Sequence, residues 1–155
     1  MNAEMQSQLQ FRDMMVVDIS QVIAIERLGH AFPWTEGIFN DCVRVGYECV
    51  VLENTTDNEI VAYGVMSVAA GEAHVFNVCV KQEFQRQGLG RYMMEHLMSV
   101  AKEKQAATIY LEVRPTNTPA ISLYEKMGFN QEGRRKNYYP DHDGREDAII
   151  MAQKL

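Results

Sequence analysis

Residues 75–91 constrain the fold more than any other stretch of the chain. They begin with the alternating apolar residues that are typical of a strand, and a short polar turn follows. The turn contains Gly88 and Gly90, and apolar residues then recur at helical spacing as far as Ala101. The sequence therefore predicts a strand, a glycine-containing loop and a helix in direct succession.

Such a junction is suited to holding a phosphate group. Glycines let the backbone approach an anion without a Cβ atom in between. The N–H groups of the first helical turn have no backbone partner, and the helix dipole favours negative charge there. Arg86 and Arg91 add positive charge on either side of the glycines. A plain strand-to-helix connection would also use these glycines, so the loop alone leaves the function open.

Two common nucleotide-binding loops do not fit these residues. The dinucleotide loop G-x-G-x-x-G needs a third glycine, and the matching position here is Met93. The phosphate loop G-x-x-x-x-G-K-[ST] is absent. What remains is Gln-x-x-Gly-x-Gly, formed by Gln85, Gly88 and Gly90.

A second informative segment covers residues 112–129, with Asn117, Ala120, Tyr124, Gly128 and Phe129 at characteristic positions. The two segments, in this order, resemble the pyrophosphate-binding loop and the second conserved segment of the GNAT family of acetyl-CoA-dependent N-acetyltransferases. The resemblance extends from about Val50 to the C-terminus. It implies the GNAT fold, with acetyl-CoA as co-substrate and no metal.

Within this family the chain is most similar to the bacterial ribosomal-protein-alanine N-acetyltransferases, the RimI subfamily, through residues 112–114 and 137–148. This similarity implies acetyl transfer to the N-terminal alanine of small-subunit ribosomal protein number eighteen. One alternative is a GNAT enzyme that acetylates a lysine or a small-molecule amine. Another is a non-catalytic acyl-CoA-binding regulatory module, which would need neither Glu112 nor Tyr124.

The resemblance implies that Glu112 is the general base and Tyr124 the general acid. An α-amino group has a pKa of about 8, against about 10.4 for lysine, so a carboxylate can deprotonate it near neutral pH directly or through a water. A phenol of pKa about 10 can protonate a leaving thiolate of pKa about 8.5. Alternatively, Glu112 is a solvated residue at a strand end and Tyr124 an aromatic that packs on the sheet.

The resemblance also implies a set of acetyl-CoA contacts. Backbone groups of residues 78–80 would face the pantetheine and the acetyl carbonyl, and those of residues 86–91 the pyrophosphate. Transfer in the family is direct, so Cys79 is expected to be a small hydrophobe and not a nucleophile. Asn117 is expected to contact the pantetheine, to cap a helix, or both. The full expected set is Val78, Cys79, Val80, Arg86, Gln87, Gly88, Leu89, Gly90, Arg91 and Asn117.

Three aromatic residues are candidates for the substrate groove, namely Trp34, Tyr138 and Tyr139. Each offers a flat apolar surface and a polar tip to an extended peptide. Each is also explained as an ordinary core or hairpin aromatic. For Tyr139 the two interpretations are evenly balanced, because adjacent strand residues face opposite sides of a sheet.

Composition limits the other possibilities. A formal charge of −6 argues against a nucleic-acid-binding surface. Three cysteines without a C-x-x-C pair and four scattered histidines favour neither a disulfide framework nor a zinc site. No apolar stretch is long enough to span a bilayer, so no membrane partner is expected. The expectation is a cytoplasmic protein, a monomer or weak dimer, whose partner is a protein N-terminus.

The order of elements predicts an α/β fold with a mixed sheet, in which helices flank the central strands. The expected order is βααβββαβαββ, with a parallel βαβ unit over residues 75–113. Asp18 and Thr35 are the expected caps of the first two helices. At 155 residues, a single GNAT domain over residues 1–155 is expected, with residues 1–8 frayed.

Overall fold

A seven-stranded sheet in the order β1-β2-β3-β4-β5-β7-β6 forms the centre of the structure, a computed structural model that describes residues 1–155. The strands are β1 (Leu9–Asp13), β2 (Glu48–Asn54), β3 (Glu59–Ala69), β4 (Glu72–Val80), β5 (Thr108–Val113), β6 (Asn130–Asp141) and β7 (Gly144–Lys154). The helices are α1 (Ala3–Gln8), α2 (Ile19–Gly29), α3 (Glu36–Arg44), α4 (Leu89–Glu103) and α5 (Thr118–Lys126). Two 3-10 turns, η1 (Val16–Asp18) and η2 (Gln82–Phe84), complete the chain.

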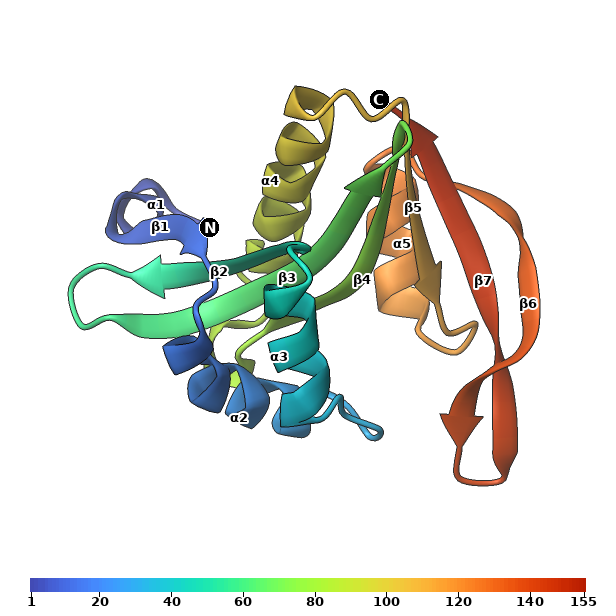
Figure 1. The fold of residues 1–155 in the computed structure, drawn as a ribbon, viewed down its shortest axis with the longest axis horizontal. Helices are drawn as coiled ribbons and strands as arrows, with labels where there is room; N and C mark the ends of the chain where they lie inside the picture. Colours follow the sequence, from blue (N-terminus) through green and yellow to red (C-terminus); the bar gives the residue numbers. More distant parts are fainter.

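The predicted mixed sheet is confirmed. Strands β4 and β5 pair in parallel across the α4 connection, and every other neighbouring pair is antiparallel. The parallel pairing is short, because it ends at Val75 and Leu111. Figure 1 shows β4 and β5 diverging from there and the β6–β7 hairpin reaching past the rest of the sheet. The expected acetyl-CoA contacts at residues 78–80 and the candidate base Glu112 therefore both lie beyond the last paired residues of β4 and β5.

Apolar side chains pack on both faces of the sheet. One cluster joins α4 to the central strands through Met93, Met94 and Leu97. The other joins α2 and α3 to the opposite face through Val22, Ile25 and Phe39. In β5 the alternation predicted from the sequence is confirmed, since Ile109, Leu111 and Val113 are buried and the residues between them are half-buried. This leaves Tyr110 and Glu112 on the face opposite α4.

The N-terminal end differs from the expectation. The sequence predicts a frayed segment over residues 1–8, whereas Ala3–Gln8 forms α1. The Asn2 side chain accepts a hydrogen bond from the Met5 backbone N–H at 2.7 Å, and Met5 packs against the apolar cluster under α4. A cap and one half-buried apolar side chain, that of Met5, together order a segment whose composition is polar.

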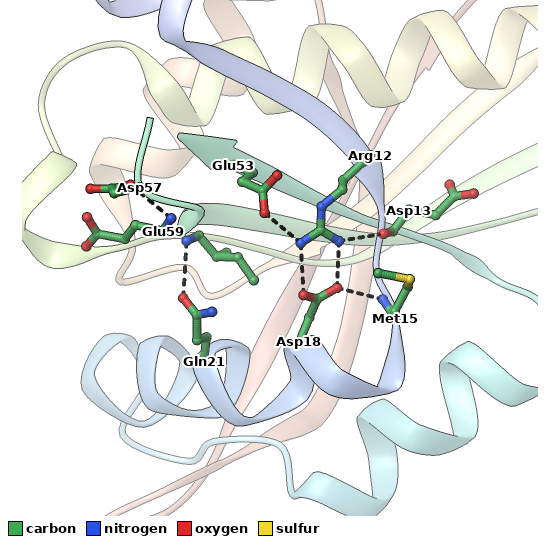
Figure 2. Close-up of polar contacts among 9 residues, drawn as sticks. Arg12, Asp13, Met15, Asp18, Gln21, Glu53, Asp57 and Glu59 are labelled. Atoms are coloured by element: carbon green, nitrogen blue, oxygen red, sulfur yellow. Dashed lines mark hydrogen bonds and ion pairs between the residues drawn. The ribbon is translucent and has the colours of Figure 1, made fainter. Parts of the chain in front are cut away.

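Asp18 lies at the start of α2, but its carboxylate does not cap that helix. It instead accepts a hydrogen bond from the Met15 backbone N–H at 2.8 Å and two from Arg12 at 2.7 and 2.9 Å. Figure 2 shows Arg12 between Asp18 and Glu53, the latter 2.9 Å away. Asp18 is therefore the N-cap residue of α2, as predicted, but it makes no capping hydrogen bond to that helix, because its carboxylate is bonded to Arg12 from β1 and to Met15. The predicted cap Thr35 is confirmed by its bond to the Ile38 N–H.

No helix of the structure is both long enough and apolar enough to cross a membrane.

Candidate active site

The glycine loop has the geometry that its sequence predicts. Gly88 precedes α4 with a φ of +82°, a left-handed conformation that glycine adopts without strain. No side chain caps the first turn of α4, and Arg86 and Arg91 are exposed beside it. The N–H groups of this turn are thus available to an anion. Leu89 is 2% exposed and anchors the start of the helix in the core.

The last residues of β4, 76–80, are not paired with β5. After Val75 the strand is bonded to β3 alone, and a bulge beside Phe76 shifts the register. Beyond the bulge, Val78 and Val80 pack toward α4, while Cys79 is buried in the cluster under α2. Burial raises the pKa of the Cys79 thiol to about 11, which disfavours a thiolate nucleophile at neutral pH.

Glu112 is enclosed and does not extend into solvent. Its side chain is only 7% exposed, although it stands near the end of a strand. His74 of β4 places Nε2 2.5 Å from Glu112 Oε2, and Arg135 of β6 places Nε 3.7 Å from Oε1. The interpretation of Glu112 as a solvated strand-end residue is therefore wrong. His74 was not among the residues that the sequence singled out for chemistry.

Tyr124 lies on α5, half-buried against the main apolar cluster. Its ring meets Phe129 edge to face, with 5.8 Å between the ring centres. Burial raises the pKa of the Tyr124 phenol, so the hydroxyl stays protonated through neutral pH. This is the protonation state that a general acid needs before the reaction. The packed aromatic that the sequence offered as an alternative is present, and it is compatible with an acid role.

Tyr139 is one of the aromatic residues expected in the substrate groove. Burial raises the pKa of its phenol, and the negative charge of Glu112 raises it further, with a smaller contribution from Tyr124. Tyr139 therefore lies within electrostatic reach of both. Its neighbour Tyr138 is 41% exposed and meets it edge to face at 4.9 Å. Tyr139 is half-buried, whereas Tyr138 is exposed.

Arg114, directly after β5, holds the β6–β7 hairpin near the loop between α2 and α3. Its guanidinium carbon lies 4.4 Å from the centre of the Tyr139 ring and 5.7 Å from that of Phe32. Phe32 also contacts the ring of His142 at the tip of the hairpin, at 5.3 Å. These contacts form one wall beside Glu112. Trp34 is half-buried and packs on Phe39 at 5.2 Å, so its contacts are with the core.

A buried carboxylate anchors the same loop, and sequence reasoning missed it. Glu26 of α2 is 2% exposed and accepts hydrogen bonds from the Tyr63 hydroxyl and from Asn77 Nδ2, the latter at 2.9 Å. Its other oxygen accepts the Trp34 backbone N–H at 2.9 Å. A single acidic residue on the apolar side of a predicted helix was the available signal.

Asn117 caps α5, since its side chain accepts a hydrogen bond from the Ala120 N–H at 3.3 Å. The capping half of its predicted role is thereby confirmed. The pantetheine contact stays a prediction, as do the other expected contacts with acetyl-CoA and with substrate. Asn117 is exposed at the end of α5 that follows β5 and Arg114.

The sequence and the fold are both similar to those of known acetyltransferases. Residues 15–129 match the Acetyltransferase (GNAT) family model. The [Ribosomal protein bS18]-alanine N-acetyltransferase of Escherichia coli K12 is 44% identical over 135 residues, covering 87% of this chain and 90% of the relative. The crystal structure of the ribosomal-protein-S18-alanine N-acetyltransferase from Escherichia coli superposes with a TM-score of 0.87 at 40% identity, covering 95% and 94% of the two chains. That of Ard1 from Thermoplasma volcanium has a TM-score of 0.86 at 27% identity, covering 96% and 98%.

Proposed function

Because this chain belongs to the Acetyltransferase (GNAT) family, we propose that it transfers an acetyl group from acetyl-CoA to the N-terminal alanine of ribosomal protein bS18. The substrate assignment rests on the 44% identity, over 87% of the chain, to an enzyme that is named for this reaction. The proposed enzyme is a single domain over residues 1–155. Because ribosomal proteins and acetyl-CoA meet in the cytoplasm, the reaction is assigned there.

In this proposal acetyl-CoA binds where β4 and β5 separate. The pyrophosphate accepts hydrogen bonds from the uncapped N–H groups at the start of α4 and is attracted by the positive charges of Arg86 and Arg91. The backbone of residues 78–80, which β5 does not pair, supports the pantetheine and the acetyl carbonyl oxygen as negative charge develops on it. The exposed side chain of Asn117, at the start of α5, contacts the pantetheine in this proposal.

The chemistry is a direct transfer. The α-amine attacks the thioester carbonyl carbon, a C–N bond forms, and Glu112 takes the proton that the nitrogen loses. The C–S bond then breaks, and the leaving thiolate takes the phenolic proton of Tyr124. A proton passing from Glu112 through solvent to the Tyr124 phenolate restores both residues. One amine proton has then moved to the thiol of CoA, and no other group has changed.

The pKa of the substrate amine favours an α-amine over a lysine, and the site offers surface for an extended peptide. The carboxylate of Glu112 is almost enclosed, with only 7% of its side chain exposed. The wall of Phe32, Arg114 and Tyr139 stands beside it. An α-amine, with a pKa about two units below that of lysine, asks less of a carboxylate at neutral pH. We therefore propose that the wall receives the first residues of an extended peptide, with Tyr138 and Trp34 as its outer contacts.

Three peptides test the substrate assignment with acetyl-CoA and intact-mass detection. They are the Ala-initiated N-terminus of the ribosomal protein, the same peptide with a blocked N-terminus, and a peptide with an internal lysine. The first should gain one acetyl group and the others none. Equal turnover of the blocked peptide, or preference for the lysine peptide, would contradict the α-amine assignment and favour the lysine alternative.

A further inference from the structure

His74 is hydrogen-bonded to the proposed base from a neighbouring strand. Its Nε2 atom lies 2.5 Å from Glu112 Oε2, although the two residues are 38 positions apart in the sequence. Parallel pairing places His74 beside Tyr110 on β5, two residues before Glu112 on the same face. The contact between His74 and Glu112 therefore forms at the end of the parallel pairing, where β4 and β5 begin to separate.

Aromatic stacking fixes the orientation of the His74 ring. Phe76, two residues further along β4, stacks on it with 4.6 Å between ring centres and a 22° angle between planes. Tyr47 also stacks on Phe76, with 5.5 Å between ring centres and a 29° angle between planes. The His74 side chain is 28% exposed, so protons can exchange between the imidazole and solvent. The ring is held in place and yet remains titratable.

The chemistry of the two groups decides which one donates. An ionised carboxylate offers only acceptors, so His74 Nε2 carries the hydrogen and Glu112 Oε2 accepts it. Glu112 Oε1 has Arg135 Nε at 3.7 Å, which is too long for a hydrogen bond. One carboxylate oxygen is thus held, and the other keeps lone pairs for an incoming proton.

We propose that His74 is a positioning residue for Glu112, which holds one carboxylate oxygen and contributes to the loss of activity at acidic pH. This inference rests on the proposed role of Glu112 as the base. When the imidazole is neutral, Glu112 is oriented and free to accept the proton of the amine. When the imidazole is protonated, the ion pair stabilises the carboxylate in its charged form and weakens it as a base.

The charged and titratable groups near the His74–Glu112 pair come from several elements. Glu112 and Tyr110 lie on the same face of β5, and Glu72 lies two residues before His74 on β4. Tyr47 stacks on Phe76 beside His74, Arg135 of β6 lies 3.7 Å from Glu112 Oε1, and the charge of Glu112 acts on Tyr139. Arg135 keeps its charge throughout the range in which enzymes are assayed. The acidic side of the kcat profile, which reports groups in the enzyme–substrate complex, is therefore where an effect of His74 is sought.

Two substitutions separate positioning from titration. His74→Gln keeps an N–H donor but cannot titrate, so kcat at pH 8 should stay within about threefold of the wild type. The pH at which kcat falls to half of its maximum on the acidic side should be lower than in the wild type by about one pH unit or more. His74→Ala removes the donor as well, and should lower kcat about tenfold with the KM for acetyl-CoA unchanged.

His96→Gln is the matched control. His96 is also half-buried and stacked on an aromatic ring, that of Phe11 at 3.9 Å, but it lies on α4 against β1. This variant should keep the wild-type kcat and acidic limb. A shift as large as that of His74→Gln would show that loss of any buried histidine suffices, and would overturn the inference.

The outcomes distinguish this inference from the proposed function. Wild-type kcat and pH profiles for both His74 variants, with Glu112→Gln inactive, would overturn the role of His74 alone. Full activity of Glu112→Gln would overturn the role of the base itself. If a His74 variant does not fold, the ring ¹⁵N resonances of His74 can be titrated in the folded wild type and in Glu112→Gln. A lower midpoint in Glu112→Gln is expected, and an identical midpoint would contradict the coupling.

Discussion

The guanidinium carbon of Arg114 lies 4.4 Å from the centre of the Tyr139 ring, which ties the end of β5 to the β6–β7 hairpin. Arg114 Nη1 also lies 3.2 Å from Glu146 Oε1 on β7, and its guanidinium carbon lies 5.7 Å from the centre of the Phe32 ring. Arg114 thus contacts both the hairpin and the loop before α3. Its position decides the shape of the wall on which the proposed peptide would bind.

Arg114→Ala should therefore weaken peptide binding more than acetyl-CoA binding. The loss of two cation–π contacts, about 0.7 kcal/mol each, should raise the KM for the peptide about tenfold. The KM for acetyl-CoA should not change. Arg134→Ala is the control, because Arg134 is 58% exposed on the same hairpin and pairs with Asp147 at 3.3 Å. An equal rise in the peptide KM for both variants would contradict a specific role of Arg114.

Tyr124→Phe should lower kcat by about two orders of magnitude or more, because the thiolate would leave without its proton donor. The affinity for acetyl-CoA, measured by calorimetry, should remain close to that of the wild type. The phenyl ring preserves the contact with Phe129, so the melting temperature should change little. Turnover equal to the wild type would remove Tyr124 from the mechanism.

Gly88→Asp should abolish acetyl-CoA binding in calorimetry. It places a negative charge and a Cβ atom where the pyrophosphate is proposed to sit, at a φ of +82°. Gly71→Asp is the matched control, since Gly71 has a φ of +80° and open space around its missing Cβ. Both variants carry similar backbone strain, but only Gly88→Asp should lose the ligand. Normal binding by Gly88→Asp would count against this loop as the pyrophosphate site.

Glu26→Ala should destabilise the fold by about 2 to 4 kcal/mol, as measured by urea unfolding. It would leave the Tyr63 hydroxyl and the Asn77 amide buried without their acceptor. Glu36→Ala, an exposed glutamate in the first turn of α3, should change stability by less than about 0.5 kcal/mol. A cost for Glu26→Ala no larger than for Glu36→Ala would show that the buried network contributes nothing to stability.

Asp18 should make stability dependent on pH. Its hydrogen bonds to Arg12 hold the pKa of its carboxyl below the usual value. A depressed folded-state pKa means that the stabilisation is present above the unfolded pKa of about 3.9 and is lost as pH falls through the folded value. Asp18→Asn should therefore be less stable than the wild type by about 2 kcal/mol at pH 7. The difference should shrink below pH of about 4, and a difference that does not depend on pH would contradict this origin.

Much of the fold could be predicted because its signals are local. The alternation in β5 and the glycines before α4 depend on residues that are neighbours in sequence, and the structure confirms both. Thr35 and Asn117 were found as caps for the same reason, since each bonds an N–H three residues later. Where a local rule failed, as at Asp18, a residue from another element competed for the same side chain.

The sequence by itself determined the elements after Gln8 and their order, because these depend on periodicity and on turn and cap residues. Glu112 and Tyr124 became candidates through the family resemblance of the segment that contains them. Only the tertiary structure decided what surrounds them. His74 meets Glu112 across 38 residues and Asn77 meets Glu26 across 51. Such contacts depend on strand register and on the bulge beside Phe76, and a shift of one residue would turn each side chain to the opposite face. The apolar pattern specifies which face is buried, but not which polar groups meet on the other.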